Sequence, residues 1–72
     1  MNLYEHILTV VDSLPEQFTV AMVRQALRER GLIEADIIVR QHINQLEAQE
    51  LLTSMRPDGR HILYSVTQEI AV

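Results

Sequence analysis

The chain has 72 residues, enough for one small domain with a thin core and too few for a second domain. Apolar residues make up 47% of the sequence, which favours a folded chain over a disordered one, and the lack of Cys excludes disulfides and thiolate metal sites. The formal net charge is −4 at pH 7, which taken alone argues against a nucleic-acid partner.

The distribution of the charges qualifies that argument. Residues 1–18 carry Glu5, Asp12 and Glu16 without a single Arg, whereas all 6 cationic residues are Arg and lie further along the chain. Arg can bind a phosphate or a guanine edge through two hydrogen bonds, which Lys cannot do. The second part of the chain is therefore the expected nucleic-acid side, although a simple compositional bias towards Arg explains the same pattern.

The first helix is expected over residues 2–13. Apolar residues recur there at helical spacing, at Leu3, Ile7, Val10, Val11 and Leu14. Pro15 ends the helix, because the residue before a Pro disfavours the helical conformation. Tyr4 and Leu8 widen the apolar stripe to one side, which indicates a second contact surface on this helix.

The second helix is expected over residues 19–30. Thr19 is a suitable N-cap, and Gly31 ends the helix because Gly tolerates the left-handed conformation that follows a helix. An apolar stripe faces inward, formed by Val20, Val23, Ala26 and Leu27. Arg24 and Arg28 lie on the outer side and are expected to contact phosphates.

The third helix is expected over residues 35–49. Its inward face gathers Ala35, Val39, Ile43, Leu46 and Glu50. The opposite face holds Ile37, Gln41, Asn44 and Ala48, flanked by Arg40 and Gln45. Asn and Gln can pair with adenine and Arg with guanine, so this face suits the reading of base edges. Ile37 is a candidate contact for a thymine methyl group or a protein partner, or a singly exposed apolar residue with no role.

Two strands are expected after the helices, over residues 51–56 and 60–66. Leu52 on the first strand and Ile62, Tyr64 and Val66 on the second alternate with a period of two. Residues 57–59 read Pro-Asp-Gly, which is a turn sequence because Pro fixes φ and Gly accepts a positive φ. Arg56 and Arg60 flank this turn, and residues 67–72 form a short tail.

These elements predict one α+β, mainly α, domain over residues 1–72, a winged helix-turn-helix. Three helices precede a two-stranded β-hairpin, so the helix over 35–49 is the expected recognition helix and residues 52–66 are the expected wing. Such a module presents one helix and one hairpin tip on a common face, which fits a DNA major groove and the adjacent backbone.

The motifs of the last elements occur in a known order. The chain reads Val39-Arg40-Gln41-His42-Ile43-Asn44-Gln45-Leu46, then Glu50-Leu51-Leu52, then Asp58-Gly59-Arg60, then Tyr64-Ser65-Val66-Thr67. This order resembles winged-helix repressors of the ArsR and MarR type. Their recognition helix often ends in hydrophobic–Ser–Arg–His–Leu–x–x–Leu, followed by a strand, a Gly-Arg wing and a strand ending Tyr-x-Leu-Thr.

The resemblance implies a set of groove-facing residues on the recognition helix, namely Arg40, Gln41, Asn44 and Gln45. It also implies that Arg60 reaches the backbone or the minor groove from the wing. Arg56 at the other side of the wing turn, with Arg24 and Arg28 on the second helix, completes the candidate DNA-binding set. The Cys-rich metal-sensing motif of ArsR sensors is absent, so no metal response is implied.

The chain is therefore expected to be a small sequence-specific DNA-binding regulator, a repressor that binds double-stranded DNA. A homodimer formed through Tyr4 and Leu8 would double the phosphate contacts. The three His residues are scattered, and no nucleophile triad or Gly-rich phosphate loop is present, so no enzyme, metal or cofactor is expected. No apolar run could cross a bilayer and the start lacks a signal-peptide pattern, so a cytoplasmic location is expected.

The alternative is a winged-helix adaptor that docks on another protein without binding DNA. Glu34 and Asp36 motivate it, because they put negative charge where a phosphate would pass, and exposed Ile37 adds an apolar contact. Both carboxylates also suit the positive end of the helix dipole. A continuous positive stripe across the folded surface, joining Arg24, Arg28, Arg40 and Arg60, would favour DNA. A stripe broken by Glu34 and Asp36 would favour protein.

Overall fold

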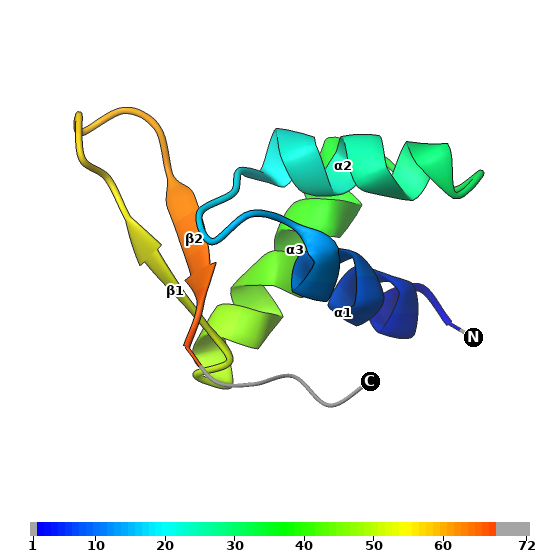
Figure 1. The fold of residues 1–72 in the computed structure, drawn as a ribbon, viewed down its shortest axis with the longest axis horizontal. Coiled ribbons are helices and arrows are strands. Elements are labelled where there is room, and N and C mark those ends of the chain that lie inside the picture. Colours follow the sequence, from blue (N-terminus) through cyan, green and yellow to red (C-terminus); the bar gives the residue numbers. More distant parts are fainter. Residues whose placement is uncertain (1, 68–72) are drawn as a thin grey trace.

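The computed structural model describes residues 2–67 and contains three helices followed by a two-stranded antiparallel hairpin (Figure 1). The elements are α1 (Leu3–Ser13), α2 (Val20–Glu29), α3 (Asp36–Ala48), β1 (Leu52–Met55) and β2 (Leu63–Val66). This is the predicted winged helix-turn-helix layout, and each predicted helix end agrees with the structure to within one residue. Of the predicted tail, residues 68–72 lie outside the described residues.

Local signals fix the helix ends. The side chain of Asn2 accepts a hydrogen bond from the Glu5 N–H at 2.9 Å, and Thr19 caps α2 by accepting from the Met22 N–H at 3.2 Å. These caps satisfy backbone donors that a helix leaves free at its start. Gly31 follows α2 with φ of +82°, the left-handed conformation that Gly adopts most easily.

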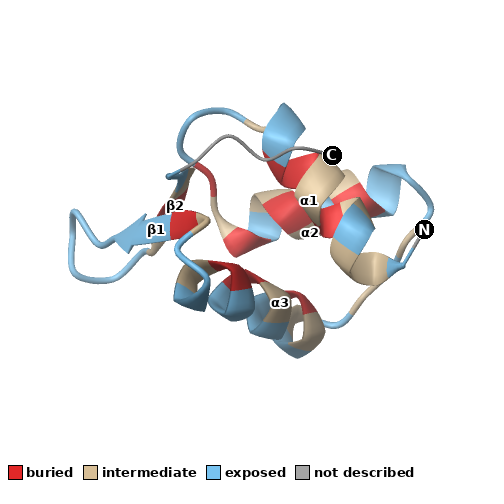
Figure 2. Cartoon of the chain, turned by 90° about the horizontal axis from the view of Figure 1, so that it is seen from below, coloured by how far each residue is buried: buried red, intermediate tan, exposed pale blue. Residues whose placement is uncertain are grey.

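The core lies between the three helices and the base of the hairpin. Each helix contributes one buried stripe, made of Ile7, Val10 and Val11 on α1, Val20, Val23 and Leu27 on α2, and Val39, Ile43 and Leu46 on α3. Figure 2 shows the consequence for α3, whose buried side faces α1 and α2 while its other side is exposed. Within residues 2–67, no helix combines the length and hydrophobicity needed to cross a bilayer.

The hairpin is joined to the rest of the fold by Phe18, just ahead of α2. The Phe18 N–H donates to the Tyr64 carbonyl at 3.0 Å, and the Tyr64 N–H donates to the Phe18 carbonyl at 2.8 Å. Their rings stack with centroids 6.1 Å apart, and both residues are buried. The sequence marks Phe18 only as an apolar residue just ahead of the second helix, because a single bridging residue leaves no alternating pattern.

The paired part of the hairpin is shorter than predicted. Leu52 pairs with Val66 and Met55 with Leu63, so the second strand begins at Leu63 and the prediction that it begins at Arg60 is wrong. The backbone N–H groups of Arg60 and His61 instead donate to the Asp58 side chain, which makes them part of the turn. The hairpin therefore has two short paired strands joined by a wide loop over residues 56–62.

Phe18→Ala should lower the free energy of unfolding by about 3–5 kcal/mol, since it leaves a cavity where a fully buried ring bridges two elements. Urea unfolding followed by circular dichroism measures this loss. Ile33→Ala is the control, because Ile33 is 79% exposed and its change should stay within about 0.5 kcal/mol. Equal stability of the two variants would contradict the role of Phe18.

Candidate nucleic-acid interface

The outer face of α3 carries the predicted base-reading residues. Arg40, Gln41, Asn44 and Gln45 are all exposed. Val39 and Ile43 on the same helix are fully buried, and the helical period turns these four residues away from the buried side. The face therefore offers base edges the donors and acceptors of three amide groups and the donors of one guanidinium.

Arg40 is held by Asp36, one helical turn earlier. Its Nε donates to the Asp36 Oδ2 at 2.9 Å, which is the ion pair expected for an i, i+4 spacing. The hydrogen bond, followed by the charge of Asp36, raises the pKa of the Arg40 guanidinium above its ordinary value. Within residues 2–67, the two terminal nitrogens of Arg40 make no hydrogen bond, so they remain available to a ligand.

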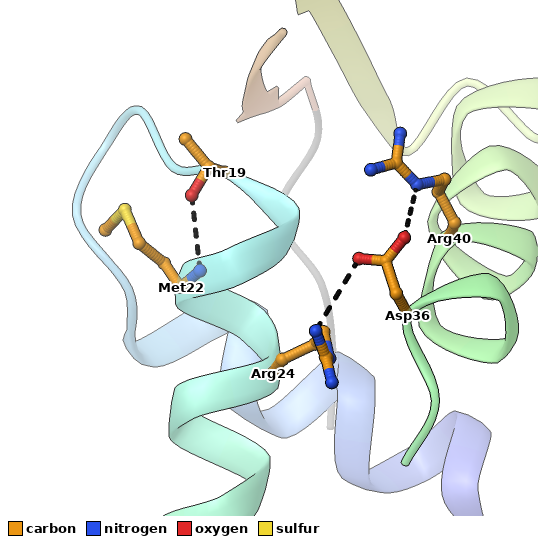
Figure 3. Close-up of polar contacts among 5 residues, drawn as sticks. All are labelled: Thr19, Met22, Arg24, Asp36 and Arg40. Atoms are coloured by element: carbon orange, nitrogen blue, oxygen red, sulfur yellow. Dashed lines mark hydrogen bonds and ion pairs between the residues drawn. The ribbon is translucent and has the colours of Figure 1, made fainter. Parts of the chain in front are cut away.

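Asp36 also faces α2. Its Oδ1 lies 3.8 Å from the Arg24 Nη1, so the carboxylate stands between Arg24 and Arg40 (Figure 3). The Arg24 Nε is buried and has no hydrogen-bond partner within the described residues. Asp36 thus interrupts the row of Arg side chains between Arg24 and Arg40, which is one part of the pattern expected for a protein partner. Among residues 2–67, Glu34 makes no ion pair.

A shallow depression of about 250 Å³ lies where α3 meets the hairpin. It is lined from the start of α2, the first half of α3 and the hairpin by Thr19, Val20, Ala21, Asp36, Arg40, Arg60, His61 and Ile62. Arg40 and Arg60, far apart in the sequence, therefore line one surface. The predicted DNA-binding residues did not include Thr19 and His61, which line this depression because the start of α2 and the hairpin pack next to α3.

Asp58 organises the turn of the wing. Its Oδ1 accepts from the backbone N–H groups of Arg60 at 2.9 Å and His61 at 2.8 Å, and its Oδ2 lies 2.6 Å from the His61 Nδ1. These hydrogen bonds, the His61 backbone N–H first, hold the pKa of the Asp58 carboxyl well below its ordinary value of 3.8. Arg56 and Arg60 are both exposed on either side of this turn.

The remaining predicted residues lie apart from this surface. Arg28 is exposed in the last turn of α2, at the end of that helix away from the hairpin (Figure 1). Tyr4 and Leu8 are half-buried on α1 and pack against the chain's own core, and the Tyr4 hydroxyl donates to Gln49 Oε1 at 3.2 Å. The structure thus gathers Arg24, Arg40 and Arg60 and leaves Arg28 and the α1 pair elsewhere.

The role of Asp36 goes beyond the sequence prediction, which gives it only a negative charge near phosphate and a favourable place in the helix dipole. The signal that indicates the ion pair is the i, i+4 spacing of Asp36 and Arg40. The approach of Arg24 has no such signal, because it depends on how α2 packs against α3.

No family model, curated protein or solved structure matches this chain. The resemblance to ArsR and MarR repressors therefore stays a prediction from the motifs quoted above. Within residues 2–67, no group of three or more His, Cys, Asp or Glu side chains is placed to hold a metal ion.

Asp58→Ala should loosen the wing turn without unfolding the core, because it removes both backbone hydrogen bonds of the exposed tip. Faster amide exchange of Arg60 and His61, measured by NMR, would show this loosening.

The same variant predicts a pH dependence. Because the pKa of the Asp58 carboxyl is lower in the folded chain, its charged form stabilises the fold above the ordinary pKa of 3.8, and this stabilisation is lost as the pH falls below that value. The stability difference between wild type and variant should therefore shrink as the solution is acidified below about pH 4. A difference that grows on acidification would contradict this assignment.

Proposed function

We propose that the chain is a small sequence-specific DNA-binding transcriptional regulator that acts as a repressor by covering a promoter. α3 enters the major groove and the hairpin lies against the adjacent backbone or minor groove. The observation that carries the proposal is the exposed face of Arg40, Gln41, Asn44 and Gln45 beside a depression shared by Arg40 and Arg60. The proposed site of action is the cytoplasm, where a bacterial regulator meets DNA.

The negative net charge is compatible with this proposal because charge acts locally in salt solution. Glu5, Asp12 and Glu16 belong to α1 and the loop after it, across the core from the outer face of α3 (Figure 2). The shortest principal extent of the molecule is 20 Å, whereas the Debye length at physiological salt is about 8 Å. Phosphates at α3 would therefore respond mainly to the nearby Arg residues and to the acidic residues close to them, which are Glu34, Asp36, Glu47 and Asp58.

Arg40→Ala and Arg60→Ala should weaken DNA binding in different ways. Loss of Arg40 removes a base contact and should lower the affinity for the preferred sequence by about 5- to 100-fold. Loss of Arg60 removes a phosphate contact, so the slope of log affinity against log salt concentration should fall by about 1 on every sequence. A salt-titrated binding assay on labelled duplex DNA from the protein's own upstream region measures both.

Arg30→Ala is the matched control for these two variants. Arg30 follows α2 at the end away from the hairpin, so its loss removes the same charge outside the proposed interface. Its binding should stay close to that of the wild type. Unchanged binding in both Arg40→Ala and Arg60→Ala would count decisively against the proposal.

The proposed DNA-bound form is a homodimer on a two-fold site, because one copy offers few cations and two copies double the phosphate contacts. Tyr4 and Leu8 on α1 are the proposed contact. Leu8→Glu should reduce a dimeric solution mass, measured by sedimentation equilibrium, to that of the monomer. The helix content of the variant must stay native, since Leu8 also touches the core. A wild-type monomer both free and on DNA would exclude this dimer.

One observation favours a second function, docking on a protein partner. Ile33 is 79% exposed and Ile37 is 58% exposed, and both lie near the start of α3, where Asp36 interrupts the Arg row. A protein adaptor of this kind should show no salt-dependent affinity for duplex DNA. The binding assay described above therefore separates the two functions.

A further inference from the structure

We propose that Asp36 is a specificity-determining positioning residue of the DNA interface. It holds Arg40 so that the free end of the guanidinium reads one guanine, and it limits the binding of phosphates by Arg24 and Arg40. The inference rests on the proposed DNA binding and concerns how that binding becomes selective.

The geometry of the ion pair leaves the outer end of the Arg40 guanidinium free. The Arg40 Nε donates a hydrogen bond to the Asp36 carboxylate at 2.9 Å, and the two terminal nitrogens make no hydrogen bond within residues 2–67. Guanine presents two acceptors in the major groove, N7 and O6, which match two donors from the end of one guanidinium. Arg40 is long and exposed, so fixing its conformation before binding reduces the entropy that a base contact must overcome.

The exposure of the pair argues against stability as its main role. The side chains of Arg40 and Asp36 are 47% and 46% exposed, and ion pairs in that environment contribute little to folding. A carboxylate at this point does, however, repel any phosphate that approaches Arg24 or Arg40. Discrimination is a difference between two affinities, so a group that weakens the wrong complex raises specificity as effectively as one that strengthens the right complex.

Asp36 also begins α3 and favours the positive end of the helix dipole. That purely structural role makes a different prediction. A loss of helix stability lowers the affinity for all DNA sequences by the same factor, whereas loss of positioning changes the ratio between sequences. The ratio is therefore the quantity to measure.

The test selects binding sequences from a random duplex DNA pool with wild type, Asp36→Asn and Arg40→Lys. Arg40→Lys keeps the charge but loses the fork, so the guanine whose preference it abolishes is the one that Arg40 reads. Asp36→Asn keeps one acceptor oxygen but loses the charge that holds Arg40, so it should lower the preference for that same guanine by about 5-fold, less than Arg40→Lys does. It should also increase the retention of unrelated DNA at low salt and steepen the salt slope by about 1.

Glu34→Gln is the matched control. It removes one negative charge two residues earlier from a side chain that makes no ion pair among residues 2–67. This variant should increase the retention of unrelated DNA while leaving the guanine preference intact. Circular dichroism must show native folding of each variant, and Asp36→Ser serves as a second charge-free replacement if Asp36→Asn does not fold.

The outcomes separate this inference from the proposed function. Wild-type binding to DNA with an unchanged guanine preference in Asp36→Asn, or with an equal loss on all sequences, would overturn the role of Asp36 and leave DNA binding standing. Wild type that retains no duplex DNA at any salt concentration would overturn both. NMR of the Arg40 Nε–H in the free protein gives a readout without DNA, and a signal unaltered by Asp36→Asn would also overturn the inference.

Discussion

The burial of one stripe of α3 is the constraint on which the rest of the surface depends. Val39, Ile43 and Leu46 are each 0% exposed and supply α3's part of the thin core that it shares with α1, α2 and the hairpin. Because side chains of a helix divide between two faces, burying this stripe turns the Arg and amide residues of α3 outward. The candidate interface is thus a direct result of how the small core is completed.

The contact between Phe18 and Tyr64 decides where the wing lies. A two-residue bridge gives β2 a partner on its second side, and the stacked rings close the core beneath it. The hairpin is thereby fixed next to the start of α2 and to α3, so Arg60 lines the same depression as Arg40. Without this bridge, a short hairpin by itself would be marginally stable in water.

Charge on this surface is adjusted locally. The acidic residues of α1 lie across the core, where salt screens them, whereas Asp36 stands directly between two Arg side chains. One carboxylate therefore has three physical effects: it suits the start of α3, it holds Arg40, and it lowers the positive potential of the face. In the proposed DNA complex, a surface with fewer free cations relies more on base contacts and less on phosphate contacts for its affinity.

The sequence by itself determined the local features of this protein. Thr19 and Gly31 mark the ends of α2, and the period of α3 separates Val39 from Arg40, because caps and helical faces involve residues within about one turn of each other. The order of the elements also predicted that α3 and the hairpin tip share a face, as the common depression of Arg40 and Arg60 bears out. Only the tertiary structure decided that Phe18 pairs with Tyr64 and that Arg24 approaches Asp36. These partners are distant along the chain, and which of them meet depends on how the helices and hairpin pack around the shared core, for which no local pattern carries a signal.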